Sequence, residues 1–182
     1  MSSTIQPLAL IEKYYADNDQ ARKCLLDHSE QVAALANAVA DKLSQTTAVD
    51  LELVDQAAWL HDIGIIFTEA PGIGCHGKSP YITHGIIGAA LLRREKLPRH
   101  ALVCERHIGV GLDQHDIQSQ QLPLPQRDMR PQSTEEQIVA YADLFFSKTK
   151  PGQRTATEVR KSLARFDQNK VKVFDEWHRR YK

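Results

Sequence analysis

The sequence predicts an all-α protein, a single-domain helical bundle spanning residues 1–182. Apolar residues recur at helical spacing along most of the chain, and no run of alternating Val and Ile indicates a strand. The chain shows no internal repeat. With 42% hydrophobic and 25% charged residues in 182, it can bury a core of its own as an ordinary globular domain.

Three helices are predicted in the N-terminal part of the chain. Residues 7–17 have the apolar spacing of a short amphipathic helix. Residues 21–43 form a longer one, with His28 on its apolar face. Asp50 is a suitable N-cap for a third helix, which carries an apolar run and which Gly64 can end.

The middle of the chain alternates between loops and helices. Residues 68–83 are rich in Gly and Pro and predict a long ordered loop, of the kind that often forms a pocket wall. A helix then begins with Thr83 as its N-cap and His84 in its first turn. Another opens near Arg99 and carries His107 in its last turns.

The C-terminal third is predicted to contain one loop and two helices. Residues 113–132 form a polar loop with three prolines. Ser133 and Glu136 resemble a capping box that starts an apolar helix, in which Asp143 is embedded. Residues 155–181 then form one long basic helix, outside a motif-bearing core at about residues 21–150.

The net charge is zero but unevenly distributed. Residues 147–182 hold eleven Lys or Arg and four Asp or Glu, a surplus of seven that the first 146 residues balance. A basic terminal helix is usually a solvated face, and it can also face phosphate or nucleic acid. Both interpretations stay open, although nucleic acid is not the expected partner.

Targeting and cysteine patterns favour a cytoplasmic protein. The N-terminus lacks the basic start and apolar core of a signal peptide, and no apolar run is long enough to span a membrane. The three cysteines are scattered and odd in number, which argues against a disulfide framework or a Cys-rich zinc site.

An adjacent His-Asp pair stands at the end of a predicted buried helix, where such groups need a partner. Other His and Asp residues occupy buried helical settings on separate helices. Imidazole and carboxylate ligands without thiolate favour Mn, Fe, Co, Ni, Zn or Mg over a structural zinc-cysteine site. The candidate metal ligands are His28, His61, Asp62, His84, His107 and Asp143.

This pattern resembles the HD superfamily of metal-dependent phosphohydrolases, in the subset that carries His-Asp-Ile-Gly. The family pattern is a His, a later His-Asp doublet and a distant Asp around one metal. Two-metal members add two histidines between the doublet and the last Asp. That resemblance implies that the ligands of the first metal are His28, His61, Asp62 and Asp143. The ligands of the second metal would then be Asp62, His84 and His107.

The resemblance implies a hydrolase that acts on a small phosphate ester, such as a nucleotide, through a metal-activated water. Two divalent ions roughly 3.5–4 Å apart need a shared carboxylate, which gives Asp62 a catalytic part. A side-chain cation can also assist the leaving group. The candidates are Lys148, which is the first choice by position, Arg106 and Lys78.

Two departures from the family bear on the activity. Cyclic-dinucleotide phosphodiesterases of this superfamily carry Lys directly after His-Asp-Ile-Gly and a downstream Gly-Tyr-Pro. Here Ile65 follows the motif and Gly-Tyr-Pro is absent, which argues against that activity. The spacing of the two added histidines is similar to that in HD-type diadenosine tetraphosphate hydrolases.

A second hypothesis is a degenerate HD domain that binds nucleotides or regulates without turnover. The sequence leaves open the substrate, the metal, whether one or two ions bind, mono- or diesterase activity and the oligomeric state. The remaining histidines are expected at the surface: His76, His100, His115 and His178.

Overall fold

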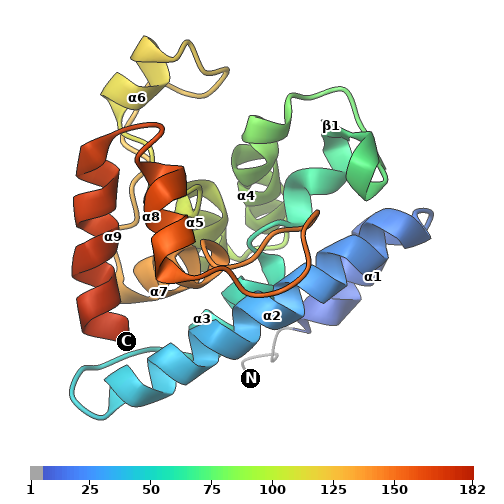
Figure 1. Ribbon diagram of the computed structural model, residues 1–182. Coiled ribbons are helices and arrows are strands. Elements are labelled where there is room, and N and C mark those ends of the chain that lie inside the picture. The colour runs from blue at the N-terminus through green and yellow to red at the C-terminus, as the bar shows by residue number, and fades with distance from the viewer. Residues whose placement is uncertain (1–5) are drawn as a thin grey trace.

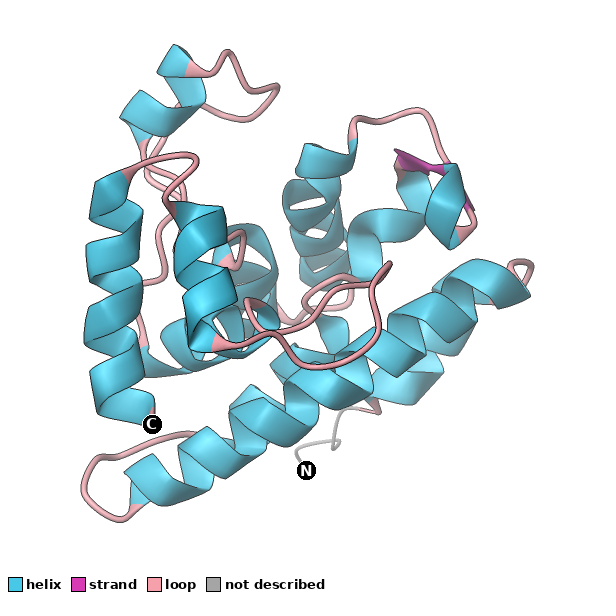
Figure 2. Ribbon diagram, viewed as in Figure 1, coloured by secondary structure: helices cyan, strands magenta, loops and turns pink. Residues whose placement is uncertain are grey.

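A computed structural model describes residues 6–182, and helices make up most of this part of the chain (Figures 1 and 2). The prediction of an all-α protein is confirmed. The α-helices are α1 (Pro7–Tyr15), α2 (Asp19–Ser44), α3 (Leu51–Leu60), α4 (His84–Arg94), α5 (Pro98–Arg106), α6 (Gln114–Ser119), α7 (Thr134–Asp143), α8 (Ala156–Leu163) and α9 (Gln168–Tyr181). Between α3 and α4 lie the 3₁₀ helices η1 (Ile63–Phe67), η2 (Pro71–Ile73) and η3 (Tyr81–Thr83) and the strands β1 (Glu69–Ala70) and β2 (Cys75–His76).

Polar caps fix the starts of the main helices. The Asn18 side chain accepts a hydrogen bond from the backbone of α2, and Asp50 caps α3 as expected, accepting from the Leu53 amide. Thr155 and Glu158 form a capping box at α8. Each cap satisfies a backbone N–H that the first helical turn leaves without a partner.

The long helix α2 organises the bundle. It packs against α3 and α7, while α4 packs against α5 and against η1. One apolar cluster joins α2, α3 and α7–α9, and a second lies among α1, α3, η1 and α4. In Figure 1, α7–α9 lie on the left and α4 lies to the right of them, and α2 runs across the lower part of the view. Metal-competent side chains on α2, α3, α4, α5 and α7 can therefore meet between them.

The predicted loop at residues 68–83 is ordered and carries structure of its own. Its strands pair antiparallel, Glu69 with His76 and Ala70 with Cys75, and η3 leads directly into α4. Thr83 is the N-cap residue of α4, as predicted, but its hydroxyl donates to the Pro80 carbonyl and does not cap the helix.

Gly64 has a different role from the helix end that the sequence suggests. The α-helix α3 already ends at Leu60, and Gly64 lies inside η1. A Cβ added at Gly64 would meet the His84 carbonyl oxygen at 2.2 Å and the Gly88 nitrogen at 2.5 Å. Gly64 is therefore required by the close approach of η1 to α4.

Two predictions about the C-terminal third are wrong. The polar loop at 113–132 contains α6, which a capping box of Asp113 and Asp116 starts. The expected long helix at 155–181 is two helices, separated by a turn that Asp167 ends by capping α9. Eleven residues separate the buried Leu163 and Phe174, which is three helical turns, so the apolar spacing stays in phase across the turn.

The capping box expected at α7 forms only in part. Ser133 accepts from the Glu136 amide, but the Glu136 carboxylate accepts from the Gln132 amide and from Arg106. Among the described residues, no helix is both long and apolar enough to cross a membrane.

Candidate metal centre

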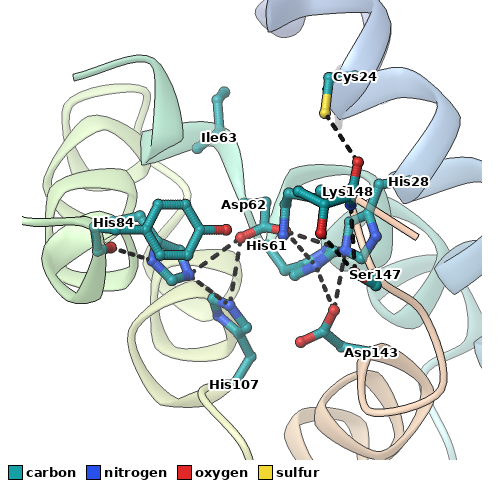
Figure 3. A network of polar contacts seen from close by, with 12 residues as sticks. Cys24, His28, His61, Asp62, Ile63, His84, His107, Asp143, Ser147 and Lys148 are labelled. Carbon is teal, nitrogen blue, oxygen red and sulfur yellow. Dashed lines mark hydrogen bonds and ion pairs between the residues drawn. The ribbon is translucent and has the colours of Figure 1, made fainter. Parts of the chain in front are cut away.

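Five helices or helix ends position six side chains at one place between the two halves of the bundle. His28 comes from the middle of α2, and His61 and Asp62 follow the last turn of α3. His84 begins α4 and His107 follows α5. Asp143 ends α7 and stands half-buried, whereas the others are buried (Figure 3). The structure thus brings all six predicted candidates together.

Three of the histidines are oriented in the same way. Nδ1 of His61 lies 2.7 Å from the Ala58 carbonyl oxygen, that of His84 lies 2.6 Å from the Tyr81 oxygen and that of His107 lies 2.7 Å from the Cys104 oxygen. A carbonyl oxygen only accepts, so each Nδ1 carries the hydrogen and donates it. Each Nε2 is thereby directed into the centre, as in histidines that bind metals.

The Asp62 carboxylate divides the centre into two groups. Its Oδ2 lies 3.2 Å from His28 Nε2 and 3.0 Å from His61 Nε2. Its Oδ1 lies 3.2 Å from His84 Nε2 and 3.5 Å from His107 Nε2. Asp143 joins only the first group, with Oδ1 3.0 Å from His28 Nε2. One carboxylate therefore faces two separate sets of ligand atoms, a division that Figure 3 shows directly.

Several buried polar atoms in this centre lack a hydrogen-bond partner. Nε2 of His61 and both carboxylate oxygens of Asp62 are among them: they lie at ion-pair distance from neighbouring groups but make no hydrogen bond, which is costly for buried polar atoms. The ligand atoms of each group lie within 4.8 Å of one another, close enough to hold a cation. The donor set therefore fits a metal.

The two histidines of the second group support the same conclusion. Nε2 of His84 and Nε2 of His107 stand 3.1 Å apart. Both rings keep their hydrogen on Nδ1, so two lone pairs face each other unless a cation lies between them. Burial lowers the pKa of His107, which keeps that ring neutral and able to bind a metal. Two nitrogens about 2.1 Å from one ion would stand about 3.0–3.4 Å apart for right-angle to tetrahedral geometry.

The first group is strongly charged when no metal is bound. Burial opposes ionisation of Asp62, but Lys148 and His61 hold the pKa of its carboxyl well below the usual range. His28 and His61 have the same effect on the pKa of Asp143. Burial likewise opposes the charge on His61, yet Asp62 and Asp143 raise its pKa to about 10. The carboxylates thus stay ionised and attract cations.

Lys148 is the cation that the structure places at the centre. It follows α7 by one short turn, is largely buried and contacts Asp62 Oδ2 through Nζ. Burial opposes its charge, but the Asp62 carboxylate raises the pKa of Lys148. Its Nζ also lies 6.0 Å from the centroid of the Tyr81 ring, within cation–π range.

The other two cation candidates lie elsewhere. Arg106 immediately precedes His107, but its guanidinium turns away and pairs with Glu136 at 3.0 Å. The buried pair ties α5 to the start of α7, so Arg106 is a structural residue here. Lys78 is exposed in the loop after β2. The structure does not bring either cation to the centre.

Sequence reasoning missed two contributors to the site and misplaced one histidine. Tyr81 stacks beside His84, with ring centroids 4.7 Å apart, and accompanies Lys148. Cys104 supplies the carbonyl that orients His107, and its thiol donates to the His61 carbonyl. His100, expected at the surface, is buried on α5 and bonds Gln56 at 2.9 Å. The one sequence signal for these missed contributors was the position of Tyr81, three residues before His84.

Two hollows open onto the centre. The inner hollow, about 390 Å³, is lined by Ile73, Tyr81, Asp143, Phe146 and Lys148 among others. The middle hollow, about 630 Å³, is lined by residues that include His28, Cys24 and Lys148. The two hollows share the wall from Ser147 to Thr149, so a ligand has room on both sides of Lys148.

The fold is a helical bundle, and its candidate site is a two-group ligand cluster with a His-Asp doublet at its centre. These two features define a class of metal-binding helical domains. A family model described as HD domain matches residues 25–146, which is most of the chain. The chain belongs to the HD domain family.

Solved structures support the fold. The HD domain of the Listeria monocytogenes phosphodiesterase PgpH superimposes with a TM-score of 0.54 at 19% identity, over 92% of this chain and 93% of that one. The same domain in complex with cyclic-di-AMP gives a TM-score of 0.55 at 18% identity, over 92% of each chain. At these identities the likeness shows the fold alone.

Curated relatives are archaeal. Proteins named tRNA (cytidine(56)-2'-O)-methyltransferase from Thermoplasma volcanium and Picrophilus torridus are 37% and 33% identical over 79% and 74% of this chain. The matches cover only 36% and 38% of those longer proteins. An uncharacterized protein of Methanocaldococcus jannaschii is 40% identical over 67% of this chain and 63% of its own length.

Proposed function

We propose that this protein is a metal-dependent phosphohydrolase that acts on a nucleotide or a related small phosphate ester. The observation that carries the proposal is the divided carboxylate of Asp62, whose two oxygens face two different sets of histidines. Paired metal sites that share one carboxylate are suited to displacement at phosphorus. Membership of the HD domain family supports the same reaction class.

In this proposal the chain's side chains divide the work of holding two divalent ions. His28, His61 and Asp143 hold one, His84 and His107 hold the other, and Asp62 is shared. When bound there, such ions would supply an activated water and offset charge on the phosphoryl oxygens. Iron, manganese, zinc, cobalt, nickel and magnesium all accept such nitrogen and oxygen ligands to different degrees.

In this proposal Lys148 is the cation that assists the reaction. Related cyclic-dinucleotide phosphodiesterases have a Lys directly after the motif, where this chain has the fully buried Ile65. The ammonium of Lys148 reaches Asp62 from a different element, the segment after α7. From this position it can neutralise a phosphoryl oxygen or protonate a leaving oxygen in the inner hollow.

A second candidate is a nucleotide-binding module without turnover. The observation that favours it is the match to about a third of two proteins named as tRNA methyltransferases, in which the matched segment is one part of a longer chain. The retained set of buried, metal-competent residues favours the hydrolase, since binding alone does not require two ligand groups.

A screen for phosphate release separates the two candidates. Protein purified without chelator is incubated with nucleotides, dinucleoside polyphosphates and sugar phosphates, with each divalent ion in turn. We expect wild-type turnover, loss of it in His107→Gln and retention in His100→Gln. His100 is a matched control because it is a buried histidine of α5, the helix that His107 follows, and lies outside the cluster.

Folded, metal-loaded protein that binds nucleotides tightly but releases no phosphate from any of them would contradict the hydrolase and support the binding module. Equal activity in His107→Gln and wild type would remove the second ligand group from the mechanism.

A further inference from the structure

A third hollow adjoins the middle hollow and is strongly basic. This outer hollow, about 530 Å³, lies between the segment after α7 and the exposed side of α8. Its walls include Lys150, Arg154, Lys161 and Arg165, against the single carboxylate of Glu158. The charge of these five groups sums to plus three.

Most of these cations have no acidic partner. Within residues 6–182, no carboxylate lies within ion-pair distance of Lys150, Lys161 or Arg165, and all three side chains are exposed. Glu158 is engaged with Thr155 in the capping box of α8. By contrast, Arg160 on the same helix is paired with Asp175. The outer hollow therefore collects unpaired positive charge from α8 and from the segments on either side of it.

The three hollows adjoin one another around residues 147–152, and together they are called the track here. The inner and middle hollows share Ser147, Lys148 and Thr149, and the middle and outer hollows share Ser147, Lys150, Pro151 and Gly152. In Figure 1 this segment, in orange, leaves α7, passes across α2 and returns to α8. A ligand held at the metal-competent centre can thus continue into the basic hollow.

The inner end of the track has a different character. Tyr81 and Phe146 line it together with Ile73 and Ala70, beside Asp143 and Lys148. Tyr81 is 38% exposed although it is a large aromatic residue, which leaves part of its surface accessible to a ligand. Aromatic surfaces at one end and cations along a groove are the combination that binds single-stranded nucleic acid, through base stacking and phosphate contacts.

We propose that the track binds the end of a single-stranded oligonucleotide. The terminal base stacks on Tyr81 and Phe146, the terminal phosphate lies at the divided carboxylate centre, and the following phosphates contact Lys150, Lys161 and Arg165. This assignment rests on the proposed hydrolase function and extends it, because it makes an oligonucleotide end the preferred substrate over a mononucleotide.

The test measures binding and selectivity in two charge-matched double variants. Lys161→Gln with Arg165→Gln removes two cations from the outer hollow. Lys172→Gln with Arg179→Gln removes two exposed cations from α9, outside the track, and controls for net charge. Binding of a fluorescent single-stranded phosphorothioate oligoribonucleotide of about 12 nucleotides is followed by anisotropy from low to high salt.

We expect the slope of log K against log salt to fall by about 1.4 in the outer-hollow variant, about 0.7 for each lost phosphate contact, and to stay at the wild-type value in the control. The ratio of kcat/KM for an oligonucleotide to that for p-nitrophenyl phosphate should fall roughly tenfold in the outer-hollow variant only. Tyr81→Ala should weaken oligonucleotide binding by roughly tenfold through loss of stacking.

Equal slopes and equal selectivity in the two double variants would overturn the proposal. Equal binding of inorganic polyphosphate, with no effect of Tyr81→Ala on the oligonucleotide, would overturn the assignment of the ligand. Hydrolysis of small esters without oligonucleotide binding would contradict oligonucleotide binding in the track and leave the hydrolase proposal intact. Oligonucleotide binding with the expected slopes, but no hydrolysis of any substrate, supports the track and refutes the hydrolase.

Discussion

Gly64→Ala tests how the fold holds the two ligand groups at their spacing. An added Cβ would lie 2.2 Å from the His84 carbonyl oxygen, whereas ordinary contact begins at 3.4 Å, so α4 must move by about 1.2 Å (3.4 minus 2.2) relative to η1. The two nearest atoms, the His84 carbonyl oxygen and the Gly88 nitrogen, both belong to the backbone and cannot rotate away from the added Cβ. Overpacking of this kind costs about 1–3 kcal/mol, and we expect a loss of stability at the upper end of that range.

The same movement acts on the candidate centre. It shifts His84 relative to Asp62 Oδ1, a contact that is now 3.2 Å long. Misplacement of a catalytic group by about 1 Å can cost roughly 100-fold in rate. The catalytic rate should therefore fall by a larger factor than the fraction of folded protein. The free energy of unfolding by urea and the metal content are measured for Gly64→Ala and for Gly72→Ala, whose added Cβ would meet nothing within 4 Å. A Gly64→Ala protein within about 0.5 kcal/mol of wild type, with unchanged metal content, would refute this reasoning.

Lys148→Met should retain bound metal and lower kcat by about 10²–10³, the effect of removing one preorganised charge from a phosphoryl or acyl site; an unchanged kcat would exclude Lys148 from the chemistry. Arg106→Gln should lower the free energy of unfolding by about 2 kcal/mol through loss of its pair with Glu136, with metal content and kcat unchanged; a selective loss of kcat would return Arg106 to the site. Chelator-treated protein should be most stable near pH 6.5, as measured by urea unfolding across pH, because the buried His107, whose pKa is lowered, must be protonated on unfolding only below that pH. The lowered pKa of Asp62 contributes stability above its ordinary 3.8 that is lost as the pH falls, and the raised pKa of His61 contributes stability below 6.5 that is lost as the pH rises through about 10. A stability maximum above pH 8 in metal-free protein would contradict these directions.

Helical periodicity predicted most of the bundle because a buried face repeats along each long helix. It failed where the signal was ambiguous or too short. The turn before Asp167 is hidden because Leu163 and Phe174 remain in helical phase. The six residues of α6 are too few to show periodicity, although Asp113 with Asp116 was a readable capping signal.

The candidate centre was predictable to the level of residue type and order. His28, the doublet and Asp143 could be named because polar ligands stand out on apolar helices. That both groups share Asp62 was expected from the family resemblance and not from the residues alone, since the division of its oxygens depends on how α4 and α5 pack against α3. The sequence favoured Lys148 over Arg106 by its position alone, and the packing adds the physical reason: Lys148 contacts Asp62, whereas Arg106 turns to Glu136.

The most direct test of a shared-carboxylate centre is the number of metal ions bound per chain. Wild-type protein and Asp62→Asn, both purified without chelator, are compared by elemental analysis after their folding is checked by circular dichroism. Loss of the one carboxylate that faces both ligand groups should reduce about two ions per chain to less than one, because both sites lose a charged ligand together. Equal metal content in folded Asp62→Asn and wild type, or folded wild type that binds none of the divalent ions supplied, would contradict the account.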